Sequence, residues 1–298
     1  MWLSLSILSA FFLGIYDVAK KYSLNNNAVF PVLIFSTMTS GLVFLPLLIA
    51  SQTGCISSQS LFFIPSIDVP SHLLLVLKSA IVLTSWIFIY YGLKQLPLSF
   101  VSPIRATAPI WTMLGAISFL GERLNAMQWV GVTVTIVFLI LFSLSGKREG
   151  ISIKNNKWLW FILIGTLTGA ASALYDKFLI IGIHPMAVQC YNAFYQILML
   201  LPLTLIFWFP AKRKGAVFKW RWSIPLIGIF LLVADFLYFY ALSLPGSLIA
   251  LVSPLRRSNA IVSFSLAAIL LKEKNIWRKA IFLAGITTGI VIIFWGSL

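Results

Sequence analysis

The pattern that decides the fold occurs twice, as SFVSPIRATAPIWTMLGAISFLGE in residues 99–122 and as ALVSPLRRSNAIVSFSLAAILLKE in residues 250–273. Each copy has Ser-Pro-x-Arg near its start, a long apolar run, and a glutamate at its end. The shared positions are displaced by 151 residues, as from Pro103 to Pro254. Self-similarity at a fixed displacement indicates an internal repeat. The chain is therefore predicted to consist of two homologous halves.

Tyrosines and aspartates extend this repeat toward the start of each half. Tyr90 and Tyr238 each stand seven residues before a proline. A Tyr-Asp pair ends at Asp17 in the first half and at Asp176 in the second, displaced by 159 residues. A longer second connection in the first half accounts for the larger displacement. Several shared features in one order favour duplication over chance.

The composition excludes an ordinary soluble protein. Of 298 residues, 60% are hydrophobic and only 10% are charged, whereas soluble chains carry roughly a quarter charged residues. A membrane-spanning helix needs about 20 apolar residues. The apolar stretches are continuous, so helices rather than barrel strands are predicted. Ten spans are expected, at 3–22, 28–50, 73–93, 99–120, 126–145, 158–178, 186–209, 223–243, 247–271 and 277–296.

Ten spans in two halves give five helices each. Because five is odd, the second half must cross the membrane in the opposite direction to the first. The predicted fold is therefore an all-α integral membrane protein made of two inverted five-helix repeats, at 1–145 and 158–298, joined by a basic loop at 146–157. Inverted repeats are typical of secondary transporters, which alternate between two packings around a midplane site.

The end of the fourth span resembles a known family. Pro109, followed thirteen residues later by Glu122 in Leu-Gly-Glu-Arg-Leu, is similar to the ten-helix EamA type of the drug/metabolite transporter superfamily. The second half departs from this pattern, since Ala260 stands where Pro109 has its counterpart. The resemblance implies export of small polar metabolites such as amino acids or organic anions, across the plasma membrane of a bacterium. It does not fix the substrate.

Two arginines inside the apolar spans are candidates for substrate binding. Arg105 and Arg256 each follow a proline by two residues, and a guanidinium grips a carboxylate or phosphate with two donors. The alternative is that each arginine pairs with an aspartate and only fastens helices. Helix bends are expected at three prolines, where backbone groups become free: Pro103, Pro109 and Pro254.

Three aspartates lie in or near the spans, where an unpaired charge is costly. Asp17 and Asp176 match across the repeat, which favours ion pairs at a gate or between the halves; substrate ammonium binding or proton coupling is the alternative. Asp235 has no counterpart, since Ile87 takes its place. It is the candidate for substrate selectivity or proton linkage, against a structural pair with an arginine.

Other polar and aromatic residues have weaker signals. Lys78 is expected to extend outward to the headgroups, and Arg257 to pair with an acid or reach a loop. The aromatic residues Trp86, Tyr90 and Tyr238 are candidates to line a cavity, although interfacial belts are the commoner use of such residues.

Catalysis and cofactor binding find no support in the sequence. His72 and His184 are far apart and lack metal-ligand spacing, and phosphate-binding and nucleophile motifs are missing. We expect no metal, cofactor or nucleic acid, because most of the +15 formal charge lies in loops beside lipid. The expected partners are a small-molecule substrate, lipid and a coupling proton, with the protein a monomer or weak dimer. The other functions considered are a membrane-embedded enzyme, a lipid-modifying or lipid-flipping subunit, and multidrug efflux.

The loop charges and the family resemblance predict opposite orientations in the membrane. Loops on the side of the termini hold 2 basic residues and those on the other side hold 16. Positive charge favours the cytoplasm, which would place both termini outside. The family resemblance implies termini in the cytoplasm. Both orientations stay open.

Overall fold

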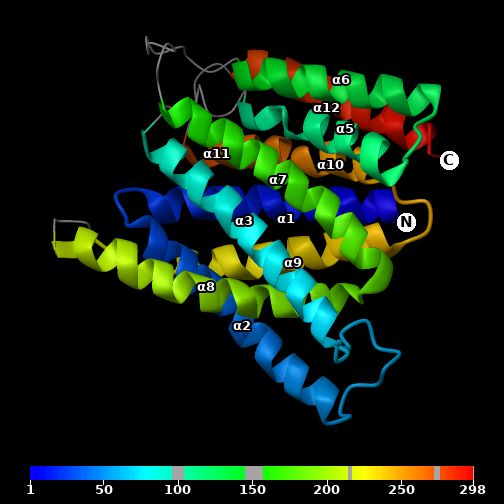
Figure 1. Cartoon of the computed structure of the whole chain (residues 1–298). Coiled ribbons are helices and arrows are strands. Elements are labelled where there is room, and N and C mark those ends of the chain that lie inside the picture. Colours follow the sequence, from blue (N-terminus) through cyan, green and yellow to red (C-terminus); the bar gives the residue numbers. More distant parts are fainter. Residues whose placement is uncertain (96–103, 145–156, 214–216, 272–275, 298) are drawn as a thin grey trace.

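In a computed structural model of the chain, residues 1–95, 104–144, 157–213, 217–271 and 276–297 are described, and every regular element among them is a helix (Figure 1). The elements are α1 (Trp2–Leu24), α2 (Val29–Gln52), α3 (Val69–Gln95), α5 (Ala108–Leu120), α6 (Ala126–Leu144), α7 (Lys157–Gly182), α8 (Pro185–Arg213), α9 (Ser223–Ser243), α10 (Ile249–Arg257), α11 (Asn259–Leu271) and α12 (Ile276–Trp295).

The helices confirm the predicted fold class. Six of the described helices, α1, α2, α3, α7, α8 and α9, are long and apolar enough to cross a membrane. The fourth and ninth spans are built from shorter pieces, α5 after a turn at 104–106, and α10 followed by α11. Both termini lie at the same end of the bundle, as ten crossings require (Figure 1). Most of the predicted connecting loop, 146–156, falls outside the described residues.

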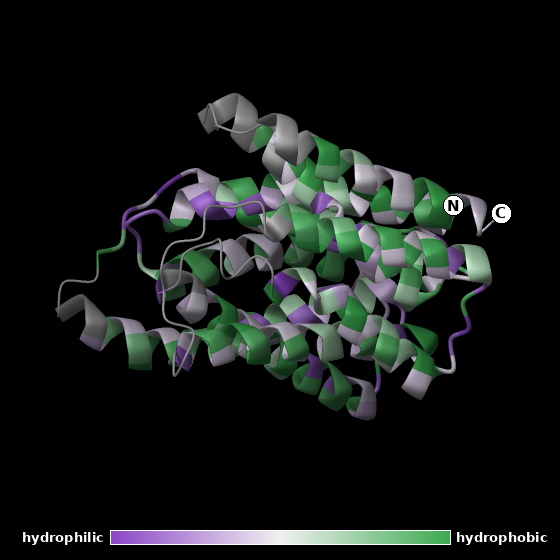
Figure 2. Cartoon of the chain, turned by 90° about the horizontal axis from the view of Figure 1, so that it is seen from above, coloured by the Kyte–Doolittle hydropathy of each residue, from purple (hydrophilic) through white to green (hydrophobic). Residues whose placement is uncertain are grey.

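Outward-facing side chains are apolar, as a lipid-facing surface requires. Phe119 is 84% exposed, Ile181 77% and Leu42 68%. Figure 2 shows hydrophobic residues over the helices, with hydrophilic residues in the connections and between the helices. In water these exposed groups would form large apolar patches, which soluble monomers rarely carry.

Helix packing follows the pseudo-two-fold symmetry of an inverted repeat. Two of the four most extensive contacts join α1 to α9 and, equivalently, α7 to α3. Each of the two remaining large contacts joins an element to its own counterpart, α2 to α8 and α6 to α12. The halves therefore interleave, and each long interface contains helices of both (Figure 1).

Small residues permit these close contacts. The Ser85 hydroxyl donates to the Gly165 carbonyl at 2.7 Å, joining α3 to α7. A Cβ added at Gly165 would lie 3.1 Å from the Ser85 carbonyl oxygen. One added at Gly289 would lie 2.7 Å from the backbone nitrogen of Thr135, across the contact of α12 with α6. These glycines allow backbones to approach as small-residue motifs do in membranes.

Each of the two broken spans has a proline near its interruption. Thr107 separates the turn at 104–106 from α5, and Pro109 lies in the first turn of α5, where a missing N–H costs nothing. In the second half, α10 ends three residues after Pro254, and Ser258 separates it from α11. Pro103 lies outside the described residues.

Two titratable side chains outside the spans cap the starts of helices. Ser71 donates from its side chain and backbone to the Asp68 carboxylate just before α3, and this holds the pKa of Asp68 below its ordinary value. At the start of α8, His184 Nδ1 accepts the Met186 N–H at 3.3 Å, and burial lowers the pKa of His184. Both satisfy N–H groups that a helix start leaves open.

Candidate functional site

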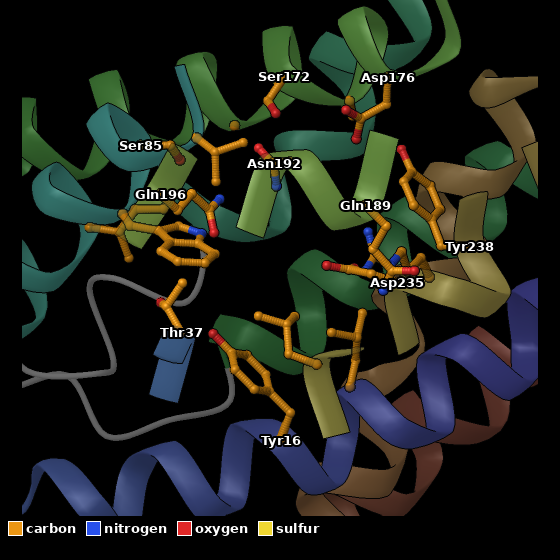
Figure 3. A pocket seen from close by; sticks show the side chains of 18 of the residues that line it. Tyr16, Thr37, Ser85, Ser172, Asp176, Gln189, Asn192, Gln196, Asp235 and Tyr238 are labelled. Atoms are coloured by element: carbon orange, nitrogen blue, oxygen red, sulfur yellow. The ribbon is translucent and has the colours of Figure 1, made fainter. Parts of the chain in front are cut away.

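A cavity of about 260 Å³ lies at the centre of the bundle, between the two halves. Its lining comes from both halves, from α1, α2 and α3 as well as from α7, α8, α9 and α10. Figure 3 shows hydroxyl, amide and carboxylate groups converging on it from several helices. The size is near the lower end of ligand pockets, which run from roughly 300 to 1,000 Å³.

Five residues form one side of the cavity, which we call the Lys20 wall: Tyr16, Lys20, Tyr90, Arg105 and Arg257. Lys20 is only 8% exposed, and its Nζ lies 4.6 Å from the centre of the Tyr90 ring. The Tyr90 and Tyr16 hydroxyls interact with each other, and Lys20 Nζ donates to the Tyr16 hydroxyl at 3.5 Å. The rings thus hold a buried ammonium through a cation–π contact, without a carboxylate in direct contact with it among the described residues.

Asp17 lies behind the Lys20 wall and joins the halves. Its Oδ2 accepts a hydrogen bond from Asn259 Nδ2 at 2.6 Å, so α1 is tied to α11. Lys20, Arg105 and Arg257 all lie within electrostatic range of Asp17 or of one another. Three cations therefore face one carboxylate in this region.

The opposite side, the Asp176 wall, is formed by Lys78, Asp176, Asp235, Tyr238 and Arg256. Lys78 and Asp176 form an ion pair between α3 and α7, and the two residues are 2% and 6% exposed. The Tyr238 hydroxyl donates to Asp176, toward which it points in Figure 3. The expectation that Lys78 extends outward was wrong, because a buried carboxylate of the other half is its partner.

Asp235 and Arg256 form the second ion pair, and it lies within one half. The Arg256 guanidinium carbon lies 4.1 Å from the centre of the Tyr238 ring, and its Nε has no hydrogen-bond partner among the described residues. Of the two alternatives for Asp235, the structure has the pair with an arginine. Arg256 faces the cavity together with Arg105, but on the opposite wall.

Arg257, the neighbour of Arg256 in sequence, does not have the environment that we predicted for it. Arg257 lines the cavity at the Lys20 wall and forms no ion pair among the described residues. The repeat aligns Arg256 with Arg105, and this alignment hides Arg257, whose counterpart is Ala106. The three aromatic candidates, Trp86, Tyr90 and Tyr238, all line the cavity.

A stripe of amides on α8 was missed by the sequence analysis. Gln189, Asn192 and Gln196 line the cavity (Figure 3). Gln189 donates to the Leu232 carbonyl at 2.6 Å, and Asn192 Oδ1 accepts from Ser79 at 2.8 Å. The spacing i, i+3, i+7 puts them on one helix face. This polar face on an otherwise apolar span is the sequence feature from which a cavity-lining role could have been predicted.

The described residues provide no metal centre: no three His, Cys, Asp or Glu side chains lie close enough to hold an ion. His72 shares a hydrogen bond of 2.8 Å with the Tyr195 hydroxyl, and His184 caps α8. The site is therefore built from paired charges, aromatic rings and amides, groups that bind a polar molecule reversibly.

Comparison with known proteins shows that the chain is similar to membrane transporters. Residues 1–144 match the EamA-like transporter family. Curated relatives include S-adenosylmethionine uptake transporters of Rickettsia bellii, 24% identical over 207 residues, and of Rickettsia prowazekii, 21% identical over 207 residues. Each alignment covers 70% of this chain and 65% or 64% of the relative, so the chain spans slightly less than two thirds of their length. A solved crystal structure shares the fold with a TM-score of 0.72, over 98% of this chain and 94% of that chain, at 14% identity.

Proposed function

We propose that this chain, whose residues 1–144 match the EamA-like transporter family, is a multi-pass membrane transporter that carries a small organic anion or zwitterion through the central cavity. The match to the EamA-like family and the transporter relatives support placing it in the drug/metabolite transporter superfamily, as a transporter rather than an enzyme. The halves 1–145 and 158–298 act as the two moving units. Their inverted packing supplies two equivalent arrangements, as alternating access requires.

The observation that carries the proposal is the uneven charge of the cavity. On the Asp176 wall two carboxylates neutralise two cations. On the Lys20 wall three cations line the cavity, and the one carboxylate nearby, Asp17, lies behind them. Buried charges are costly unless paired. An anionic group entering the cavity would supply the missing partner.

The rest of the cavity suits an amino-acid-like molecule. The amides of Gln189, Asn192 and Gln196 offer donors and acceptors, and Trp86 and Tyr238 offer ring faces. A carboxylate at the Lys20 wall leaves the remainder of such a substrate against these neutral groups. S-adenosylmethionine, the substrate named for the relatives, carries an α-amino carboxylate and is one candidate.

The direction of transport has two candidates. The family resemblance implies export, whereas the curated relatives are uptake transporters. Asp235 could exchange Arg256 for a proton during the cycle, which would couple transport to a proton gradient. We place the protein in a bacterial plasma membrane, as a monomer or weak dimer.

The test is flux in liposomes that contain the purified protein. Labelled amino acids, other carboxylates, S-adenosylmethionine and organic cations are offered in both directions, with and without a pH gradient. We expect saturable flux of a carboxylate-bearing compound. Lys20→Met should reduce that flux at least tenfold, and the adjacent exposed Lys21→Met serves as the matched control. Flux of organic cations alone would favour multidrug efflux, and no flux of any compound would contradict the proposal.

A further inference from the structure

Glu122 does not line the cavity but makes a contact between the two halves. The residue follows α5 of the first half, yet its carboxylate binds the start of α10 in the second. Oε1 accepts the Ile249 N–H at 2.8 Å and Oε2 accepts the Ala250 N–H at 2.9 Å. The first N–H groups of a helix lack partners within it, and the dipole there favours negative charge.

The local sequence explains how Glu122 reaches α10. Gly121 adopts a φ of 65°, and its N–H and that of Glu122 both bond back to the Ala116 carbonyl. This left-handed turn ends α5 abruptly, as glycine does at helix ends. Glu122 itself is 8% exposed. A buried carboxylate with two N–H donors is well satisfied where it lies, and would lose both donors if α10 moved away.

The contact closes the end of the bundle that bears both termini. Ile249 lines the cavity on one side, and Ile249, Ala250 and Leu251 are all fully buried in an apolar cluster with Leu75 and Leu179. Beyond this cluster the connection between α9 and α10 becomes exposed at Pro245 and Gly246. The start of α10 thus separates the cavity from that end.

Lys177 holds the same connection from α7. Its Nζ donates to the Ser247 carbonyl and hydroxyl, each at 2.8 Å, and to the Leu242 carbonyl at 3.0 Å. It also lies within electrostatic range of Glu122. Because Lys177 and the connection belong to the same half, they can move together. Glu122 belongs to the other half, so its hydrogen bonds to the start of α10 must break if the halves separate at this end.

From this geometry we infer that Glu122 is the latch of a gate, a positioning residue whose hydrogen bonds to the start of α10 keep the terminus-bearing end closed. Opening that end requires the first half to release α10. The inference rests on the protein being a transporter, but on no particular substrate or direction.

The test measures opening without transport. In a Cys55→Ser/Cys190→Ala background, Ala187→Cys places a reporter thiol in the apolar cluster, where Ala187 is fully buried in the same cluster as the start of α10. The labelling rate by a charged maleimide is measured in nanodiscs. We expect Glu122→Gln, which keeps the size but turns a donor toward one N–H, to raise the rate about tenfold. Arg123→Gln, at the adjacent exposed position, should leave it within twofold.

An unchanged labelling rate in folded Glu122→Gln protein would overturn the inference, as would equal rises in both variants. Folding is checked by the elution volume and the melting temperature. If Glu122→Gln does not fold, Glu122→Asp decides, since its shorter carboxylate should raise the rate by a smaller factor. Failure to find a substrate would leave this experiment unaffected, so the two proposals fail separately.

Discussion

The two walls of the cavity are built around repeat-equivalent tyrosines but differ in charge. The Tyr90 hydroxyl interacts with the neutral Tyr16 hydroxyl and Tyr90 has Lys20 over its ring, whereas Tyr238 donates to the Asp176 carboxylate and has Arg256 over its ring. A cation stacks on the equivalent ring in both halves, yet it comes from a different element each time. Duplication has kept the scaffold while the charges diverged. A cavity with unlike walls favours one orientation of a substrate that has an anionic end.

The largest expected effect tests whether the Asp176 wall depends on its ion pair. Lys78→Met leaves Asp176 buried without a cation, which should cost about 3–5 kcal/mol of unfolding free energy. Thermal or denaturant unfolding in detergent measures the loss. The double variant Lys78→Met/Asp176→Leu should recover most of it. Equal stability of the single and double variants would show that the pair does not matter.

The next prediction compares equivalent arginines on the two walls. Arg105→Gln should weaken binding of an anionic substrate ten- to a hundredfold, since a hydrogen bond to a charged group contributes about 1.5–3 kcal/mol. Its melting temperature should change little. Arg256→Gln should instead lower the melting temperature, because Asp235 loses its partner. Calorimetric binding and melting curves separate the two results, and identical profiles would remove the distinction between the walls.

The next prediction removes a carboxylate, that of Asp235, from the Asp176 wall by the substitution Asp235→Asn. The substitution keeps size and hydrogen bonding but breaks the ion pair with Arg256, which is partly exposed, so we expect a loss of about 1–2 kcal/mol in unfolding free energy. Flux should lose its response to an imposed pH gradient while substrate binding persists. Full flux that still follows the pH gradient would show that Asp235 does not carry the coupled proton.

The smallest effect separates the two tyrosines. Tyr238→Phe removes a donor to a carboxylate, whereas Tyr90→Phe removes an interaction with a neutral hydroxyl. Hydrogen bonds to charged groups are the stronger, so the melting experiment should show a greater loss for Tyr238→Phe, by about 1 kcal/mol. Equal losses would mean that the Asp176 carboxylate gains nothing from the tyrosine.

The spans and the repeat could be predicted because they depend on local composition. The ten expected spans agree with the helices to within a few residues, apart from residues outside the described ranges. The matched aspartates Asp17 and Asp176 both bind residues of the opposite half. Asp176 does so in an ion pair with Lys78, whereas Asp17, for which an ion pair was also expected, accepts a hydrogen bond from the neutral Asn259 amide and forms no ion pair among the described residues.

Pairing inside the cavity could not be predicted, because it depends on contacts between distant segments. Lys78 lies near the start of its span and was expected at the headgroups, but its partner is 98 residues away. Arg257 was expected to pair with an acid or reach a loop, because the repeat aligns its neighbour with Arg105. Lys20 is one of the 16 basic residues assigned to the loops opposite the termini, although two tyrosine rings hold it inside. Residue type and depth alone do not reveal such partners.

The separation of Lys78 from its partner has a consequence for biosynthesis. Asp235 and Arg256 are 21 residues apart and can meet soon after both emerge from the ribosome. Lys78 must wait for 98 further residues, which takes on the order of 5–20 s at about 5–20 residues per second. During that time its ammonium lies in a newly inserted helix, at an insertion cost of about 2.5–3.5 kcal/mol if it sits at the bilayer centre. The nascent third span therefore needs to stay at the insertion machinery, or near the interface, until the sixth span, which contains α7, is inserted and Asp176 can pair with Lys78.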